Sequence, residues 1–117
     1  MSTPASNAPR EGDIIYVDLN PIIGHEQGGK RPVLVLSEQR YNAKTGMAFV
    51  VPLSTRIKGY PFEVPIEADT PLPTVAIADA GRSIDWRSRA AVRKGTVPPA
   101  VLQKVRRRLA QVIGLVA

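Results

Sequence analysis

The chain lacks cysteine altogether and carries a single histidine. Without thiols it can form no disulfide, thiolate metal site, iron–sulfur cluster or cysteine nucleophile. One histidine cannot supply a His-rich metal site or a two-histidine acid–base pair within one chain. A reducing cytoplasm is compatible with this composition.

Long apolar runs are missing as well, since no stretch approaches the ~18 apolar residues that a bilayer-spanning helix needs. Residues 1–11 are polar, contain two prolines and lack the apolar centre of a signal peptide. The total of 117 residues has room for one hydrophobic core. The sequence therefore predicts a flexible leader over residues 1–11 and one domain over residues 12–117, in a cytoplasmic protein without a membrane partner.

Positive charge is the most distinctive feature of the composition. The 16 Lys and Arg residues exceed the 10 Asp and Glu residues, for a net charge of +6, which favours a polyanion such as nucleic acid as partner. Residues 21–59 carry +4 and residues 82–108 carry +8, whereas residues 1–20 carry −2 and residues 60–81 carry −4. This alternation predicts a folded surface with a polarised face, because a basic tail would place the charge at one end.

Short runs rich in Val and Ile, separated by Gly and Pro, are typical of strands. Six such runs predict a small barrel or sandwich, and they cover residues 13–19, 32–37, 47–53, 62–66, 74–78 and 90–93. Between them, turn-forming residues predict loops, among them residues 42–46.

One helix is expected, at the C-terminus. Pro98 and Pro99 suit a first helical turn, apolar residues follow at three- and four-residue spacing up to Ile113, and Gly114 can end the helix. The basic run at residues 106–108 is interpreted as a solvated helix face, with direct RNA contact as the alternative.

Two loops gather polar side chains beside glycine. Residues 24–32 hold an acid, a potential base and two cations, and residues 52–59 hold two hydroxyls and two cations. Loops on a rigid scaffold often carry binding and catalytic groups. The first loop lacks the glycine patterns of nucleotide-binding loops; the second suits a phosphodiester, and a capped basic turn explains its spacing equally well.

Longer motifs carry a resemblance to a known family. They are GDIIYVD at residues 12–18, EQGGKRPVLVLS at 26–37, YN at 41–42, KTG at 44–46, KGYPFEV at 58–64, SIDW at 83–86 and KGTV at 94–97. In this order, from about Gly12 to Gly114, they resemble the MazF/PemK toxins of bacterial toxin–antitoxin systems. The resemblance implies a mainly β (small α+β) fold, an SH3-like antiparallel β-barrel with a C-terminal amphipathic helix.

The resemblance also implies an activity and partners. The expected enzyme is a ribosome-independent, sequence-specific endoribonuclease that cleaves single-stranded mRNA without a metal or another cofactor. The RNA 2′-OH attacks the adjacent phosphate and leaves a 2′,3′-cyclic phosphate and a 5′-OH end. The expected partners are a second copy in a homodimer and a MazE-like antitoxin with an acidic disordered tail, and the toxin–antitoxin complex is a candidate for operator DNA binding.

Matched position by position, the resemblance gives catalytic roles to Arg31, Ser54 and Glu26. The planar guanidinium of Arg31 suits two phosphate oxygens, and Ser54 supplies a hydroxyl donor where many relatives have threonine. Glu26 is a candidate general base, or it orients Arg31. His25 is the alternative base by its chemistry.

Single-stranded RNA is usually bound by aromatic stacking and cations. The residues expected to contact RNA are His25, Gln27, Lys30, Thr55, Arg56, Lys58, Tyr60, Asp79, Arg82, Trp86 and Arg87. Trp86 suits a contact with a second copy or an antitoxin equally well.

Position 80 departs from the family pattern, because Ala80 stands where many relatives have glutamine. This departure motivates an alternative function, a non-catalytic RNA- or DNA-binding adaptor of the same fold. A metal-dependent nuclease is a third reading, and no local carboxylate spacing supports it.

Overall fold

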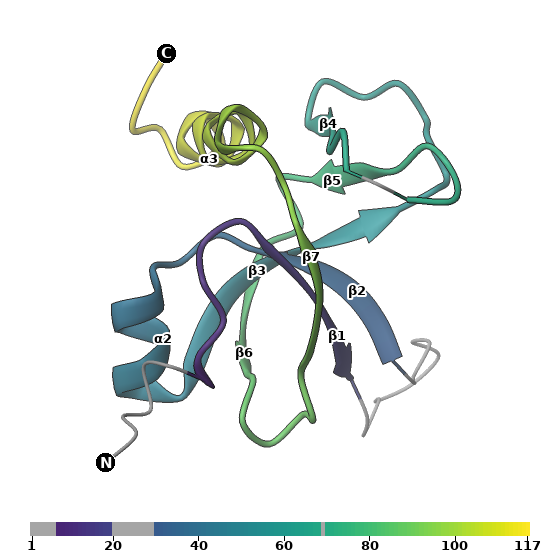
Figure 1. Cartoon of the computed structure of the whole chain (residues 1–117). Helices are drawn as coiled ribbons and strands as arrows, with labels where there is room; N and C mark the ends of the chain where they lie inside the picture. Colours follow the sequence, from purple (N-terminus) through teal and green to yellow (C-terminus); the bar gives the residue numbers. More distant parts are fainter. Residues whose placement is uncertain (1–6, 20–29, 69) are drawn as a thin grey trace.

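The computed structural model describes residues 7–19, 30–68 and 70–117 (Figure 1). Its elements are β1 (Asp13–Asp18), β2 (Lys30–Val35), α2 (Gln39–Thr45), β3 (Met47–Ser54), β4 (Glu63–Pro65), β5 (Val75–Ile77), β6 (Arg82–Asp85), β7 (Val92–Thr96) and α3 (Pro99–Val112). Figure 1 shows α3 and the β4–β5 pair at one end of the sheet and α2 at the other. None of the described helices is long and apolar enough to cross a membrane.

The strands pair antiparallel in the order β4-β5-β3-β2-β1-β7, and β6 also pairs with β3. Strand β3 connects the two halves of the sheet, since its residues 47–50 pair with β6 and its residues 53–54 pair with β5. Among the described residues no ladder joins β6 to β7, so the curved sheet is not closed. The predicted antiparallel SH3-like arrangement with a C-terminal helix is confirmed, in this open form.

The central strands are apolar on both faces because they separate two clusters of buried side chains. Ile14 and Leu34 face the cluster covered by α3 and the β4–β5 pair, whereas their neighbours Ile15 and Val33 face a second cluster completed by Ile84 of β6. Successive side chains of a strand point to opposite faces. Burial on both faces explains why β1, β2 and β3 are nearly continuous apolar runs.

Helix α3 begins where the two prolines predict, with Pro98 before its first turn. Val101, Leu102 and Val105 are buried against the sheet. Arg106 donates two hydrogen bonds to the backbone oxygen of Leu36, through Nε at 3.1 Å and Nη2 at 2.5 Å. The first arginine of the basic run therefore ties α3 to the end of β2 and does not project into solvent with its neighbours.

The structure corrects the sequence prediction at three places. Helix α2 contains part of the predicted turn at 42–46, and it ends at Gly46 in the left-handed region with a φ of 74°. Strand β6 was not expected. The last strand is Val92–Thr96, where the sequence predicted 90–93.

The described part of the predicted leader, residues 7–11, contacts the sheet and α2. Ala8 is buried, its backbone oxygen accepts a hydrogen bond from Gln39 Nε2 at 3.1 Å, and Pro9 O accepts one from Asn42 Nδ2 at 2.9 Å. Residues 1–6 lie outside the described residues.

Candidate functional site

A groove of about 1050 Å³ crosses the sheet between β7 and the connection from β4 to β5. It takes its walls from β1, β2, β7, the end of β3 and that connection. Its lining residues are Ile14, Tyr16, Arg31, Pro32, Leu53, Ser54, Thr55, Arg56, Ala68, Thr70, Pro71, Leu72, Thr74, Lys94, Gly95 and Thr96. We call this space the groove.

The groove is positively charged. Arg31, Arg56 and Lys94 line it, and no Asp or Glu is among its described lining residues. The part of the chain with a net charge of −4, residues 60–81, contributes only uncharged described residues, from Ala68 to Thr74. A concave surface with one sign of charge attracts and concentrates an oppositely charged ligand. The groove therefore suits an anion.

Two residues with hydroxyl groups, Ser54 and Thr55, lie where β3 ends and line the groove. Ser54 is the last residue of the strand, and its Oγ accepts a hydrogen bond from the backbone N–H of Arg56 at 3.0 Å. This bond uses a lone pair of the Ser54 oxygen. The hydroxyl hydrogen can therefore donate to an acceptor in the groove. Arg31, Ser54, Thr55 and Arg56, four of the residues expected from the sequence, thus line one space.

The loop after Arg56 is organised by one carboxylate. Glu63 Oε1 accepts hydrogen bonds from the backbone N–H groups of Lys58 (3.0 Å), Gly59 (2.7 Å) and Tyr60 (3.3 Å), and Oε2 accepts Lys58 N–H at 3.1 Å. Lys58 Nζ lies 5.9 Å from the centre of the Tyr60 ring, and Tyr60 is 62% exposed. Desolvation alone would raise the pKa of Glu63, but the N–H groups of Lys58, Gly59 and Tyr60 and the Lys58 charge together hold the pKa below its ordinary value. Glu63 therefore fixes the backbone that carries Lys58 and Tyr60, and neither of these residues is among the described residues that line the groove.

Of the remaining expected residues, three lie outside the described part of the chain and five lie apart from the groove. Glu26, His25 and Gln27 fall within residues 20–29 and lie outside the described residues. Lys30 is exposed and faces Asp18 across the β1–β2 ladder. Asp79 and Arg82 are exposed near the start of β6 and line no part of the groove. In the described part of the chain, no three His, Asp or Glu side chains form a set that could hold a metal ion.

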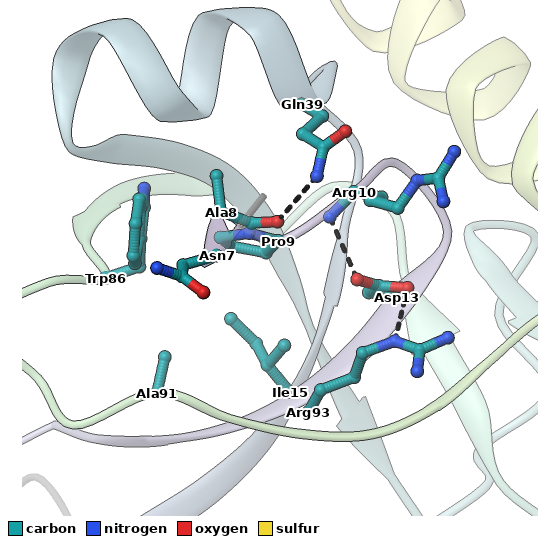
Figure 2. Close-up of a pocket in the computed structure, with 10 residues that line it drawn as sticks. All are labelled: Asn7, Ala8, Pro9, Arg10, Asp13, Ile15, Gln39, Trp86, Ala91 and Arg93. Carbon is teal, nitrogen blue, oxygen red and sulfur yellow. Dashed lines mark hydrogen bonds and ion pairs between the residues drawn. The ribbon is translucent and has the colours of Figure 1, made fainter. Parts of the chain in front are cut away.

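Trp86 lies at a second cavity, of about 590 Å³, on the other face of the sheet (Figure 2). Trp86 lines this cavity opposite Arg10 and Arg93, with Ile15 and Ala91 between them. Its Nε1 donates a hydrogen bond to the backbone oxygen of Asn42 at 2.9 Å. The structure therefore does not bring Trp86 together with Arg31 and Ser54.

Arg87, like Trp86, forms a hydrogen bond to the backbone of α2. Its guanidinium lies 5.1 Å from the centre of the Trp86 ring, and its Nη2 donates to Ala43 O at 2.6 Å. Both side chains thus help to fasten the connection after β6 to α2.

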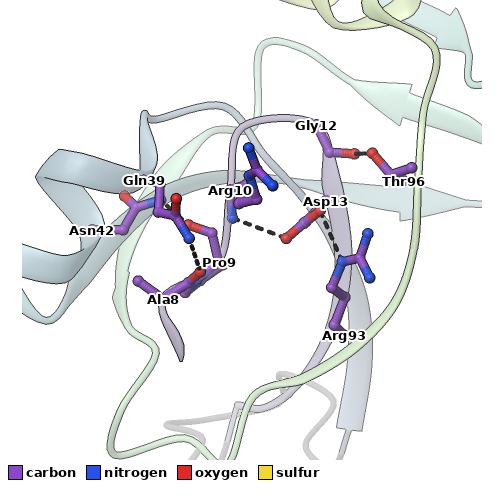
Figure 3. Close-up of polar contacts among 9 residues, drawn as sticks. All are labelled: Ala8, Pro9, Arg10, Gly12, Asp13, Gln39, Asn42, Arg93 and Thr96. Atoms are coloured by element: carbon purple, nitrogen blue, oxygen red, sulfur yellow. Dashed lines mark hydrogen bonds and ion pairs between the residues drawn. The ribbon is translucent and has the colours of Figure 1, made fainter. Parts of the chain in front are cut away.

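A polar network supports this second cavity (Figure 3). Asp13 is buried and accepts hydrogen bonds from Arg10 N at 2.9 Å and from Arg93 Nε at 3.1 Å. Arg93 is 61% exposed as a side chain, so the ion pair lies at the rim. Thr96 Oγ1 donates to Gly12 O at 3.2 Å and joins β7 to the start of β1. These contacts fix β7, the strand that also lines the groove.

Sequence reasoning missed Lys94 and Tyr16 as groove residues. Lys94 Nζ lies 5.4 Å from the centre of the Tyr16 ring, and both residues line the groove. Gly95, inside a strand, was the available signal, because an isolated glycine in a strand often marks a bulge. The ladder between β1 and β7 does shift register there, between Ile14 and Ile15.

Comparisons with known proteins agree over nearly the whole chain. The family model described as "PemK-like, MazF-like toxin of type II toxin-antitoxin system" matches residues 10–113. The chain is 48% identical over 106 residues to the endoribonuclease toxin MazF of Escherichia coli strain K12, covering 91% of this chain and 95% of that protein. It is 33% identical to the endoribonuclease PemK of Escherichia coli, with 87% and 80% covered.

The fold matches solved structures to the same extent. A crystal structure of MazE–MazF (Form-II) from Deinococcus radiodurans superposes with a TM-score of 0.83 at 43% identity, covering 93% of this chain and 98% of that chain. A crystal structure of MazF (Form-I) from the same organism gives 0.81 at 44% identity, with 92% and 97% covered.

Proposed function

The chain belongs to the PemK-like and MazF-like toxins of type II toxin–antitoxin systems, and from that premise we propose that it is an endoribonuclease that cleaves single-stranded RNA in the groove. The observation that carries the proposal is that Arg31 and Ser54, which are 23 positions apart in the sequence, line the same basic groove. A guanidinium and a hydroxyl can donate hydrogen bonds to the phosphoryl oxygens, on which negative charge grows during an in-line displacement. The adjacent Arg56 adds a second guanidinium to the same wall.

The proposed reaction needs no group beyond RNA and this chain. The RNA 2′-oxygen loses its proton to a base, forms a bond to the adjacent phosphorus and displaces the 5′-oxygen of the next nucleotide, which takes up a proton. Arg31 binds the phosphoryl oxygens as negative charge grows on them, and Ser54 donates a hydrogen bond to one of them. Glu26, or His25, is the proposed base, and each lies outside the described residues. The products are a 2′,3′-cyclic phosphate and a 5′-OH end.

The proposed partners follow from the same family. A relative's solved structure contains MazE together with MazF, and we assign this chain an acidic MazE-like antitoxin whose tail competes with RNA for the basic groove. We also propose that the toxin is a homodimer and that operator DNA is bound only through the antitoxin complex.

Cleavage of a long transcript tests the proposed function. Purified protein in excess EDTA is expected to cut single-stranded RNA into discrete fragments, whose 5′-OH ends are labelled by polynucleotide kinase without prior phosphatase treatment. Arg31→Ala is expected to lower the cleavage rate at least about 100-fold, since removal of one transition-state donor costs ~2.7–4 kcal/mol. The matched control is Arg40→Ala on α2, because Arg40 is exposed and does not line the groove.

Melting curves show whether each variant is folded, and Arg31→Lys keeps the charge while losing the planar fork. Intact RNA from folded wild-type protein would contradict the proposal, as would wild-type cleavage by a folded Arg31→Ala variant. Tight RNA binding without cleavage would favour the non-catalytic adaptor. Cleavage that needs added Mg²⁺ would favour a metal-dependent nuclease.

A further inference from the structure

A β-bulge in β7 places Lys94 in the groove. Across the β1–β7 ladder Ile14 pairs with Gly95 and Ile15 pairs with Arg93, so Lys94 is the extra residue between two paired positions. In a regular ladder Lys94 would stand opposite Ile15, whose side chain faces the second cluster, away from the groove. Bulges insert one residue and redirect side chains, often beside functional sites. Here Lys94 lines the groove while its neighbour Arg93 bonds Asp13 on the other face.

Tyr16 holds the ammonium group of Lys94 on the face of the sheet that carries the groove. Lys94 Nζ lies 5.4 Å from the centre of the Tyr16 ring, a distance at which the negative ring face attracts a cation. Tyr16 is 37% exposed and belongs to β1, the strand between Lys94 and Arg31. A cation–π contact leaves the ammonium hydrogens that point away from the ring free to bind an anion.

The geometry separates Lys94 from the proposed scissile position. Lys94 is on β7, whereas Arg31 is on β2, and β1 lies between these two strands. Two interstrand spacings of ~4.8 Å put the two backbones about 10 Å apart. We propose that Lys94 binds a phosphate of the RNA that neighbours the scissile phosphate, and that the bulge and Tyr16 position it for this role. The proposal rests on the proposed function of the groove.

A phosphate contact outside the scissile bond acts on binding more than on chemistry. An interaction made equally in the ground state and the transition state changes KM and leaves kcat unchanged. Loss of one charge-assisted contact of ~1.5 kcal/mol raises Kd about tenfold. Each phosphate contact to single-stranded RNA also contributes ~0.7 to the slope of log K against log salt. A residue with a merely structural role would leave this slope unchanged.

The test uses Lys94→Gln in the full chain. Kd is measured by fluorescence anisotropy over a series of NaCl concentrations, with a labelled RNA oligonucleotide that spans a mapped cut and carries 2′-O-methyl at the cleaved nucleotide. Kd is expected to rise about tenfold, and the salt slope to fall in magnitude by about 0.7. Cleavage of the unmodified oligonucleotide is expected to show the same rise in KM with kcat within about twofold of wild type.

Matched variants separate the phosphate contact from general charge and from folding. Lys104→Gln removes the same charge from the exposed face of α3 and is expected to leave Kd and the salt slope nearly unchanged. Lys94→Arg is expected to restore the slope. Tyr16→Phe keeps the ring and is expected to bind as wild type, whereas Tyr16→Leu removes it and is expected to raise Kd with the salt slope intact.

Three results would overturn the proposal. They are a wild-type salt slope in a folded Lys94→Gln variant, an equal effect of Lys104→Gln, and a fall in kcat larger than the rise in KM. In each case wild-type cleavage would leave the proposed function standing. Failure of wild-type protein to cleave RNA would instead contradict the proposed function, and failure to bind the oligonucleotide would refute the role of Lys94 as well.

Discussion

A single buried amide joins three separate parts of the second cavity's surroundings. Asn42 is 0% exposed, and its Nδ2 donates to Pro9 O at 2.9 Å and to Ser37 O at 3.1 Å. Its Oδ1 accepts the Ser37 hydroxyl at 2.6 Å, and its backbone oxygen accepts Trp86 Nε1 at 2.9 Å. Every polar atom of this side chain is paired, so the N-terminal segment, the start of α2 and Trp86 depend on one residue.

Asn42→Asp is therefore expected to destabilise the fold. The change replaces a donor NH₂ by an oxygen facing two carbonyl oxygens, and it places a charge where no water reaches. We expect the free energy of unfolding to fall by about 3 kcal/mol, the upper part of the range for an unsatisfied buried polar group. Urea unfolding followed by the fluorescence of the single tryptophan measures it. Asn7→Asp, the same change at an exposed position, is the control, and equal stability of the two variants would contradict the prediction.

At the scale of elements, the loop from Ile57 to Phe62 depends on a side chain outside it. Three backbone N–H groups converge on the Glu63 carboxylate, and no regular ladder is needed to hold the loop. The pKa of Glu63 is held below its ordinary value of 4.5, against the opposing effect of desolvation, by these N–H groups and the Lys58 charge. A lowered pKa means that the charged form stabilises the folded loop. This contribution is fully present above pH 4.5 and is lost as the pH falls through the lower folded-state pKa.

Glu63→Gln is expected to loosen this loop and to remove its pH dependence. The neutral amide has one acceptor oxygen in place of two and carries no charge. NMR measurement of amide hydrogen exchange at Lys58, Gly59 and Tyr60 is expected to show faster exchange than in wild type at pH 7. In wild-type protein the same amides are expected to lose protection, relative to amides of β3, as the pH falls below 4.5 and through the lower folded-state pKa of Glu63.

Glu67→Gln is the matched control for the loop, since Glu67 is an exposed carboxylate four residues further along. Unchanged exchange at the three amides in Glu63→Gln, or equal loosening in Glu67→Gln, would refute the assigned role of Glu63.

The elements that sequence reasoning missed lack an apolar signature. Helix α2 is the polar segment QRYNAKT, and its one buried residue is Asn42, so no apolar stripe marks it. Strand β6 has one fully buried side chain, Ile84, between exposed Arg82 and partly buried Asp85. In contrast, β1, β2, β3 and α3 bury several apolar side chains each, and their positions follow from pattern alone. Polar elements that are held by tertiary contacts give periodicity nothing to detect.

Some of the predicted site residues line the groove and others lie far from it, and strand pairing explains which. Ser54 is the last residue of β3. Trp86 directly follows β6, and β6 pairs with the other end of β3, where Met47 is the first residue. Seven residues of strand at ~3.3 Å each separate these positions by about 23 Å. Proximity of Arg31 to Ser54 follows from the family motifs, but the distance of Trp86 and the shift that redirects Lys94 depend on register, which composition and spacing do not encode.

On the scale of the whole molecule, the charge pattern seen in the sequence becomes a polarised surface. The groove takes Arg31 and Arg56 from the first basic segment and Lys94 from the second. The acidic segment between them lines the groove only through uncharged described residues. The net charge of +6 thus underestimates the local positive potential that RNA or an acidic antitoxin would meet.

A second whole-molecule feature is the apolar end of α3. Val112 and Ile113 continue the helix stripe but are 45% and 60% exposed, and Leu115 and Val116 beyond the helix are 73% and 38% exposed. The core covers the stripe from Val101 to Leu109 and leaves the end of the helix uncovered. Contiguous exposed apolar surface often marks a protein–protein contact. This end of α3 is our candidate for the surface that the proposed homodimer buries.

Ile113→Lys tests that assignment, because a charge placed in a desolvated apolar contact is costly unless it is paired. Sedimentation equilibrium is expected to give twice the 12.7 kDa chain mass for wild type. For Ile113→Lys the measured mass is expected to shift toward that of a single chain, because the dimer dissociation constant rises at least about tenfold, or ~1.4 kcal/mol. Gln103→Lys adds the same charge at an exposed polar position of α3 and is expected to remain dimeric. A monomeric wild type would contradict the homodimer itself, whereas a dimeric Ile113→Lys variant would place the contact elsewhere on the molecule.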